Sequence, residues 1–335
     1  MQTEMEKATK NRMDRKQSSS IWNMKAFAVI AIIACHCCHV SENASEINVR
    51  STEFLGYWIG YGVPVFYFLS GYLFTCDERG ILHFIRKKLV TIVVPWTVTG
   101  TAVWLYIVLR KGGMTLSGWV EYVFLRGSYL YFLTDLVLYF ALFYAVRRYP
   151  FLRYLASGYL FGGLFINTVF RLDLFFPLYA LGLPVSHTLV FYSGILAREY
   201  DVLKKFSERK WVLMTAVFIV IRWLELHEMV PGYLDAAVYL AGVLSLTAGL
   251  YAACHEIAKR EVWYVEDLGR YSFPLYLLHM PAAGLVSRVL NRSEIFAPLT
   301  VLRPLIVIFI TMILIKLYER LTGEREIFRL LIGER

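Results

Sequence analysis

The sequence predicts an all-α, polytopic integral membrane protein: a helical bundle of about ten transmembrane helices with both termini in the cytoplasm. Three observations support this fold class. Of the 335 residues, 58% are apolar and only 18% are charged, whereas about 25% are charged in a typical soluble domain. The mean hydropathy is positive, at +0.51. The apolar residues form long segments that a single soluble core could not hide.

Each apolar segment is close to the ~20 residues that a helix needs to cross the hydrocarbon. The expected spans are residues 21–40, 55–76, 89–109, 129–146, 154–170, 177–197, 211–229, 233–256, 267–290 and 298–318. The longest gaps, near 110–128 and 198–210, are too short to fold as a soluble domain. We therefore expect a transmembrane domain over 21–320, a basic cytoplasmic tail over 1–20 and a second cytoplasmic tail over 321–335.

The orientation follows from the lysine and arginine residues of the short loops, which collect on the cytoplasmic side of a membrane. Alternate gaps and the C-terminal tail are basic: Arg79, Arg86, Lys87 and Lys88; Arg147, Arg148 and Arg153; Arg198, Lys204, Lys205, Arg209 and Lys210; Lys259 and Arg260; Lys316, Arg320, Arg325 and Arg329. The opposite loops are poorer in positive charge. Arg110, Lys111, Arg288 and Arg292 are exceptions, because this orientation places them on the outer side.

The charge and the cysteines exclude several other classes of protein. The net charge of +9 comes from separate clusters between apolar runs, so it does not indicate a nucleic-acid partner. The run Cys35-His36-Cys37-Cys38-His39 looks like a metal cluster, but neighbouring residues on a helix point about 100° apart. Too few ligands would converge for a closed site, and we expect no metal. The first apolar run is expected to be a membrane helix rather than a cleaved signal peptide.

Ionisable side chains inside a membrane are costly and usually mark function. Lys25 and His36 lie in the first expected span, within about 20° of each other on one helical face and about 16 Å apart along the axis. Both also have a structural interpretation. Lys25 could extend its amine to the cytoplasmic interface, and His36 could be a packing histidine.

Further candidates lie in later spans. Asp135 has no partner nearby in the sequence, so it either meets a cation on another helix or lines a polar cavity. Arg222 and Glu225 are three residues apart and are expected to pair with each other. His279 is expected inside the bundle, in a functional or a packing role, because an imidazole facing lipid would lack hydrogen-bond partners.

Several motifs occur in an order that is typical of one family. Lys25, ten residues and His36 resemble an Arg–ten–His pattern, and residues 62–74, 84–96, 131–133, 191–196 and 268–279 are similar to five further motifs. Together they resemble the membrane acyltransferase-3 family, which O-acylates sugars and related molecules. The resemblance runs from about residue 21 to 318. Two positions differ: Lys25 replaces the arginine, and Thr91 stands where many members have a second arginine.

This resemblance implies a stand-alone, multi-pass O-acyltransferase of a bacterial cell membrane, without the hydrolase-like domain that some members carry. The donor would be acyl-CoA, most often acetyl-CoA, and the acceptor a hydroxyl of a glycan or lipid-linked sugar. His36 would be catalytic, as a general base or as a nucleophile that forms an acyl-histidine. Candidates for binding the donor phosphates are Lys25, Arg86, Lys87 and Lys88, and candidates for contacting the substrates are Ser70, Tyr72, Tyr131, Asp135 and His279.

A transporter or flippase with the same architecture is the competing interpretation, in which the intramembrane charges would form ion or substrate sites. The two halves of the sequence show no clear similarity, and the charged groups concentrate in the first three helices, which favours the enzyme. The expected partners are acyl-CoA, the acceptor and membrane lipids, with no nucleic acid. A homodimer is the candidate assembly.

Overall fold

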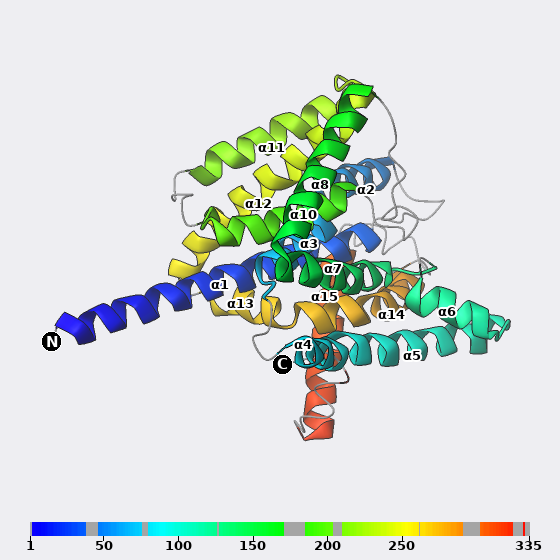
Figure 1. Ribbon diagram of the computed structural model, residues 1–335. Coiled ribbons are helices and arrows are strands. Elements are labelled where there is room, and N and C mark those ends of the chain that lie inside the picture. The colour runs from blue at the N-terminus through cyan, green and yellow to red at the C-terminus, as the bar shows by residue number, and fades with distance from the viewer. Residues whose placement is uncertain are drawn as a thin grey trace. The chain divides into compact units, whose positions relative to one another are not determined.

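The computed structural model describes residues 2–37, 46–75, 80–125, 127–170, 185–203, 210–260, 262–290, 302–323 and 331. Within these ranges the regular elements are helices, and none is a strand (Figure 1), which confirms the all-α class. Four described helices are long and apolar enough to cross a membrane: Gln17–Cys37, Ile81–Arg110, Asp235–Lys259 and Ser272–Leu290. The count of about ten spans and the location of the termini stay predictions.

Most expected spans correspond to one helix. These are α1 (Gln2–Cys37), α5 (Val94–Lys111), α7 (Tyr131–Arg148), α8 (Pro150–Phe170), α10 (Val185–Glu199), α11 (Lys210–Leu226), α12 (Asp235–Lys259) and α15 (Arg303–Thr322). Helix α1 begins at Gln2, so residues 2–20, the expected cytoplasmic tail, are helical and continuous with the first expected span. Their location in the cytoplasm stays a prediction.

Two expected spans are wrong as single helices. Residues 55–76 are divided between α2 (Glu46–Ile59) and α3 (Gly62–Tyr72), and residues 267–290 between α13 (Trp263–Arg270) and α14 (Ser272–Leu290). Breaks of one or two residues inside an apolar run leave its mean hydropathy almost unchanged, so hydropathy does not register them.

The third expected span, 89–109, also has a more complex start. Helix α4 (Ile81–Lys88) continues through a π-helical turn, η1 (Leu89–Val93), into α5. Pro95 follows this turn, and a proline has no N–H for the regular helical hydrogen bond. The gap near 110–128 holds an unexpected short helix, α6 (Leu116–Phe124), capped by Thr115, whose Oγ1 accepts a hydrogen bond from the Gly118 N–H at 3.1 Å.

The chain forms two compact units. Unit 1 contains Met1–Phe27, Pro64–Cys76 and Leu138–Arg270; unit 2 contains Ala28–Val63, Asp77–Val137 and Tyr271–Arg335. In unit 1, α11 packs along α12, and α10 packs on α8 and α12 (Figure 1). In unit 2, α14 packs against α15 and α5, and α5 against α6.

Three motif glycines explain the close packing of unit 1. A Cβ atom on Gly71 of α3 would lie 1.9 Å from the Phe191 carbonyl oxygen of α10, and one on Gly194 of α10 would lie 2.1 Å from the Phe68 carbonyl oxygen of α3. A Cβ on Gly269 of α13 would lie 1.9 Å from the Trp22 carbonyl oxygen of α1. Small residues let helix backbones approach this closely inside a membrane protein.

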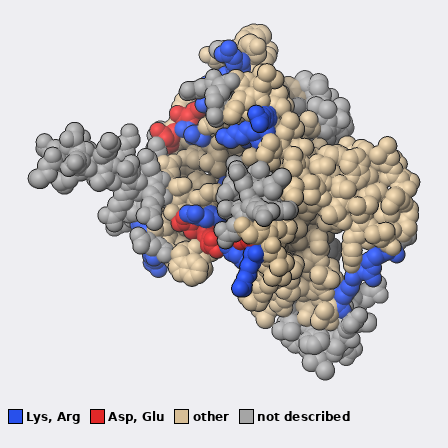
Figure 2. All heavy atoms as spheres, turned by 90° about the horizontal axis from the view of Figure 1, so that it is seen from below, with Lys and Arg blue, Asp and Glu red and all other residues tan. Residues whose placement is uncertain are grey.

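The surface is unusually apolar. Many large apolar side chains are exposed, including Leu82 at 81% and Leu109 at 79%. The face drawn in Figure 2 shows broad uncharged areas, with lysine and arginine side chains in small separate groups. Such a surface is expected of a protein that faces lipid rather than water.

The crossing of α3 and α10 predicts a sharp effect of a single methyl group. We expect Gly71→Ala to lower the free energy of unfolding by about 1–3 kcal/mol, because the new Cβ would force the two backbones apart. Gly162→Ala in α8 is the matched control: nothing lies within 4 Å of its Cβ position, so the change should be neutral or slightly stabilising. Thermal unfolding of both purified variants in detergent measures the difference, and equal melting temperatures would contradict this account of the crossing.

Candidate active site

Two histidines from distant parts of the sequence meet in unit 2. His36, in the last turn of α1, lies beside His279 of α14, with ring centroids 5.1 Å apart. The Tyr129 ring lies 6.4 Å from the His36 ring and 5.2 Å from the His279 ring, centroid to centroid. His279 is fully buried and His36 is half-buried. The structure therefore brings together two of the predicted site residues, and His279 lies in the interior as expected.

A proline inside α14 explains why Tyr129 is held there. Pro281 interrupts the helical hydrogen bonds of α14, because it has no N–H to donate to the carbonyl oxygen of Leu277, four residues earlier. The Tyr129 hydroxyl donates to that oxygen instead, at 2.7 Å. The Tyr276 hydroxyl in turn donates to the Tyr129 carbonyl oxygen at 2.5 Å. These reciprocal bonds fix the segment before α7 against the middle of α14.

The hydrogen bonds of His279 determine which of its nitrogens is a base. Its Nδ1 lies 2.6 Å from the Tyr276 carbonyl oxygen. A carbonyl oxygen can only accept, so Nδ1 carries the hydrogen and the neutral ring presents a lone pair at Nε2. That Nε2 atom is buried and has no hydrogen-bond partner among the described residues. Buried polar atoms are nearly always satisfied, so an unused acceptor at this position points to a role for it.

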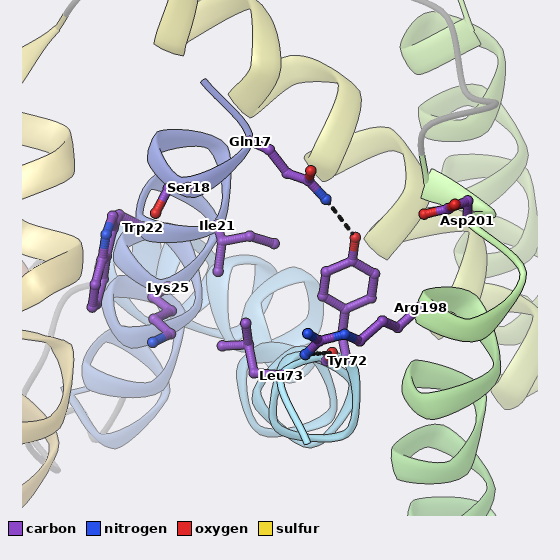
Figure 3. Close-up of a pocket in the computed structure, with 9 residues that line it drawn as sticks. All are labelled: Gln17, Ser18, Ile21, Trp22, Lys25, Tyr72, Leu73, Arg198 and Asp201. Atoms are coloured by element: carbon purple, nitrogen blue, oxygen red, sulfur yellow. Dashed lines mark hydrogen bonds between the residues drawn. The ribbon is translucent and has the colours of Figure 1, made fainter. Parts of the chain in front are cut away.

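A second group of predicted residues lines an open cavity of about 430 Å³ in unit 1 (Figure 3). Its lining residues are Gln17, Ser18, Ile21, Trp22, Lys25, Tyr72, Leu73, Arg198 and Asp201. The amine of Lys25 lies 4.2 Å from the centroid of the Trp22 ring, and Gln17 Nε2 donates to the Tyr72 hydroxyl at 2.8 Å. The cavity therefore combines two cations, one carboxylate and two aromatic rings.

Arginines complete the end of α3 beside this cavity. The last carbonyl groups of a helix have no helical partner. Arg198 Nη1 donates to the Tyr72 carbonyl oxygen at 3.2 Å, as Figure 3 shows, and Arg147 Nη1 donates to the Phe74 carbonyl oxygen at 3.2 Å. Arg198 thus has a structural contact, while its exposed side chain keeps further N–H groups available at the cavity.

Polar side chains of α1 attach this helix to its neighbours in unit 1. Ser19 Oγ donates to Glu266 of α13 at 2.8 Å, and Asn23 Nδ2 donates to the Cys254 carbonyl oxygen of α12 at 3.3 Å. Ser20 Oγ lies 3.2 Å from His255 Nδ1. These bonds hold the α1 wall of the cavity in place.

The remaining predicted site residues are distributed between the units. Arg86 and Lys87 are exposed on α4 of unit 2, and Lys88 is half-buried with its amine 5.5 Å from the Phe84 ring centroid. Tyr131 is half-buried and Asp135 is buried on α7, both in unit 2. Ser70 is half-buried on α3 in unit 1 and does not line the cavity.

Other expectations have simpler outcomes. Arg222 pairs with Glu225 through Nη1 and Oε2, as predicted. Among the described residues, no three His, Cys, Asp or Glu side chains are arranged to hold a metal ion. Cys38 and His39 lie outside the described residues.

Several residues of these two sites were absent from the sequence-based candidates, and three of them carry the argument: Tyr129, Pro281 and Arg198. A proline two residues after His279, inside an expected span, signals an unpaired carbonyl group, but nothing local identifies Tyr129 as its donor. In the sequence, Arg198 was recognised only as one of several cations of a basic loop.

Comparison with known proteins identifies one family. A family model described as an acyltransferase domain, of the acyltransferase-3 type, matches residues 19–318. No curated protein matches the chain, and no solved structure does.

The bond between Tyr129 and α14 can be tested by a double-mutant cycle. Tyr129→Phe should lower the free energy of unfolding by about 1–3 kcal/mol, because the buried Leu277 carbonyl loses its donor. Pro281→Ala restores an N–H that can bond to this carbonyl. In the Pro281→Ala background, Tyr129→Phe should therefore cost clearly less. Thermal unfolding of the four proteins measures the coupling, and an equal loss in both backgrounds would refute the assignment.

Proposed function

Since this match places the chain in the acyltransferase-3 family of membrane acyltransferases, we propose that it transfers an acetyl group from acetyl-CoA to a hydroxyl of a glycan or a lipid-linked sugar. The observation that supports the chemistry is the buried, unused Nε2 acceptor of His279 next to the half-buried ring of His36. General-base catalysis of acyl transfer needs an accessible base and a group that orients it, and this pair supplies His36 as the base and His279 as a hydrogen-bond acceptor beside it.

The transfer forms a bond between the acceptor oxygen and the acyl carbon and breaks the thioester bond between that carbon and sulfur. In the proposed mechanism, His36 takes the hydroxyl proton as the oxygen attacks, and the departing CoA sulfur receives that proton afterwards. Imidazole suits both steps, because its ordinary pKa lies near neutrality.

His279 is the positioning residue of this mechanism. When His36 carries the proton, its second ring nitrogen can donate to Nε2 of His279, which orients the His36 ring and stabilises its charge. A buried carboxylate has the corresponding role beside the histidine of a hydrolytic triad. Ring centroids 5.1 Å apart are compatible with a direct hydrogen bond between two imidazoles after a small rotation. In the alternative route, His36 attacks the thioester itself and forms a transient acyl-histidine.

For the donor, we propose that the cavity of unit 1 binds the phosphates of CoA. Lys25 and Arg198 supply positive charge there, and phosphate oxygens accept strong charge-assisted hydrogen bonds from both groups. The eleven-residue spacing of Lys25 and His36 in the sequence corresponds to about 16 Å along a helix axis, a length that an extended pantetheine arm can cover. Arg86, Lys87 and Lys88 of α4 would attract the donor electrostatically without forming the cavity.

The test uses the purified full chain in lipid nanodiscs with acetyl-CoA carrying a labelled acetyl group. Labelled acceptor or hydrolysed acetate supports the enzyme. Uptake of acetyl-CoA or sugar by proteoliposomes, without any turnover, would contradict it. Labelled protein that accumulates without acceptor and carries the acetyl group on His36 would identify the acyl-histidine route.

The histidine pair makes the sharpest prediction about turnover. His36→Ala should reduce acyl transfer by roughly 10²–10⁴-fold, while the protein still binds CoA. His279→Leu should also reduce kcat strongly, and His279→Gln should recover part of it, because the amide oxygen can still accept a hydrogen bond. His227→Ala, at the exposed end of α11, is the control and should keep wild-type activity. An active His36→Ala protein would show that the catalytic histidine is misplaced.

Two substitutions of Lys25 distinguish the effect of its positive charge from the effect of its side-chain geometry. Lys25→Ala should raise KM for acetyl-CoA, while Lys25→Arg should keep most of the affinity, because the positive charge is retained. Steady-state kinetics at fixed acceptor measure both. If Lys25→Ala left KM and kcat unchanged, Lys25 would be a topological anchor only.

A further inference from the structure

An exposed group of two arginines and one tyrosine lies in unit 2 and includes neither residue of the histidine pair. The hydroxyl of Tyr106 on α5 accepts a hydrogen bond from Arg110 Nη1 at 3.1 Å and another from Arg288 Nη1 of α14 at 2.8 Å. The two guanidinium carbons lie 5.7 Å and 5.9 Å from the centroid of the Tyr106 ring. We call these three residues the arginine pair site.

The arrangement concentrates positive charge. Because both Nη1 atoms bond to one oxygen, they are at most about 6 Å apart, a distance at which like charges repel. Neither arginine forms an ion pair with a carboxylate of the described residues, although Arg153, Arg222 and Arg270 do. A neutral phenol oxygen therefore gathers two cations that nothing described here neutralises, and an anion is the missing complement.

The residues around the two arginines indicate where in the membrane this anion would lie. Arg110 lies in the last turn of α5 and Arg288 in the last turn of α14, so both are at the ends of expected spans. Large apolar side chains next to them are exposed: Leu109 at 79%, Val289 at 57% and Leu285 at 52%. Aromatic and basic residues at the end of an apolar surface are typical of the level of the lipid headgroups.

We propose that the arginine pair site binds the phosphate group of a membrane lipid. The two guanidinium groups offer several N–H donors from two sides of one anion, and arginine binds phosphate through paired hydrogen bonds. The neighbouring apolar side chains would contact the acyl or prenyl chain of the same molecule. The site also accounts for Arg110 and Arg288, two of the cations that depart from the expected charge asymmetry of the loops. This inference does not depend on the proposed acyl transfer.

Native mass spectrometry of the purified full chain tests the site with phosphatidylglycerol and, as the neutral-headgroup comparison, phosphatidylcholine. The wild type should bind phosphatidylglycerol preferentially. Arg110→Gln together with Arg288→Gln should weaken this binding by about tenfold or more, because two charge-assisted hydrogen bonds are lost. Tyr106→Phe should weaken it less, since both charges remain while their common anchor is lost. All three positions are exposed, so these variants should fold, and size-exclusion chromatography checks this.

The matched control is Arg148→Gln together with Arg320→Gln, which also removes two exposed positive charges and should keep phosphatidylglycerol binding. A polyprenyl diphosphate probe distinguishes the lipid source: tighter binding than phosphatidylglycerol assigns the site to a lipid-linked sugar, and weaker binding assigns it to bulk anionic lipid. Displacement of both lipids by inorganic phosphate at equal concentration would overturn the lipid assignment. Unchanged lipid binding in the Arg110→Gln, Arg288→Gln variant would overturn the site itself.

Discussion

Polar groups inside the hydrocarbon core of a membrane have no water to bond with, so each must find a partner within the protein. In α14 this constraint has a direct chemical result. Pro281 leaves the Leu277 carbonyl without a helical donor, and Tyr129 supplies one. The Tyr276 carbonyl accepts from His279 Nδ1, and this bond leaves Nε2 as the one ring atom of His279 that is free to accept. The hydrogen bonds of this part of α14 thus leave one acceptor atom of His279 in the interior.

Close packing of helices inside the membrane also explains the glycines of the motifs. Gly71, Gly194 and Gly269 stand where a neighbouring backbone carbonyl would overlap any side chain. Gly71 and Gly194 let α3 and α10 approach closely, and Gly269 does the same for α13 and α1. The cavity of unit 1 is lined from α1, α3 and α10, and Lys25 and Tyr72 face the same space there. Lys25 carries a positive charge without the planar fork of an arginine, and Arg198 provides a guanidinium group in the same cavity.

Hydropathy and charge were sufficient to predict the all-α class, and the ordered motifs were sufficient to predict the family. They also placed His36 and His279 among the candidates. What they could not provide was the breaks at Gly60 and Tyr271, because a short interruption hardly changes the mean of an apolar segment. The role of Tyr129 was also inaccessible, since it depends on a contact with a residue 148 positions away. Nothing in the sequence singled out Arg198 or Tyr106. Arg198 joins the cavity, and Tyr106 the arginine pair site, only because separate helices come together in the fold.

In the proposed reaction, the thioester of the donor reacts beside the His36–His279 pair. A density map of the full chain with a non-hydrolysable acetyl-CoA analogue tests it most directly. We expect the acyl carbonyl to lie within about 4 Å of the His36 ring, the separation of a reactive complex. A map in which the acyl group is bound elsewhere, with no contact to His36, would contradict it.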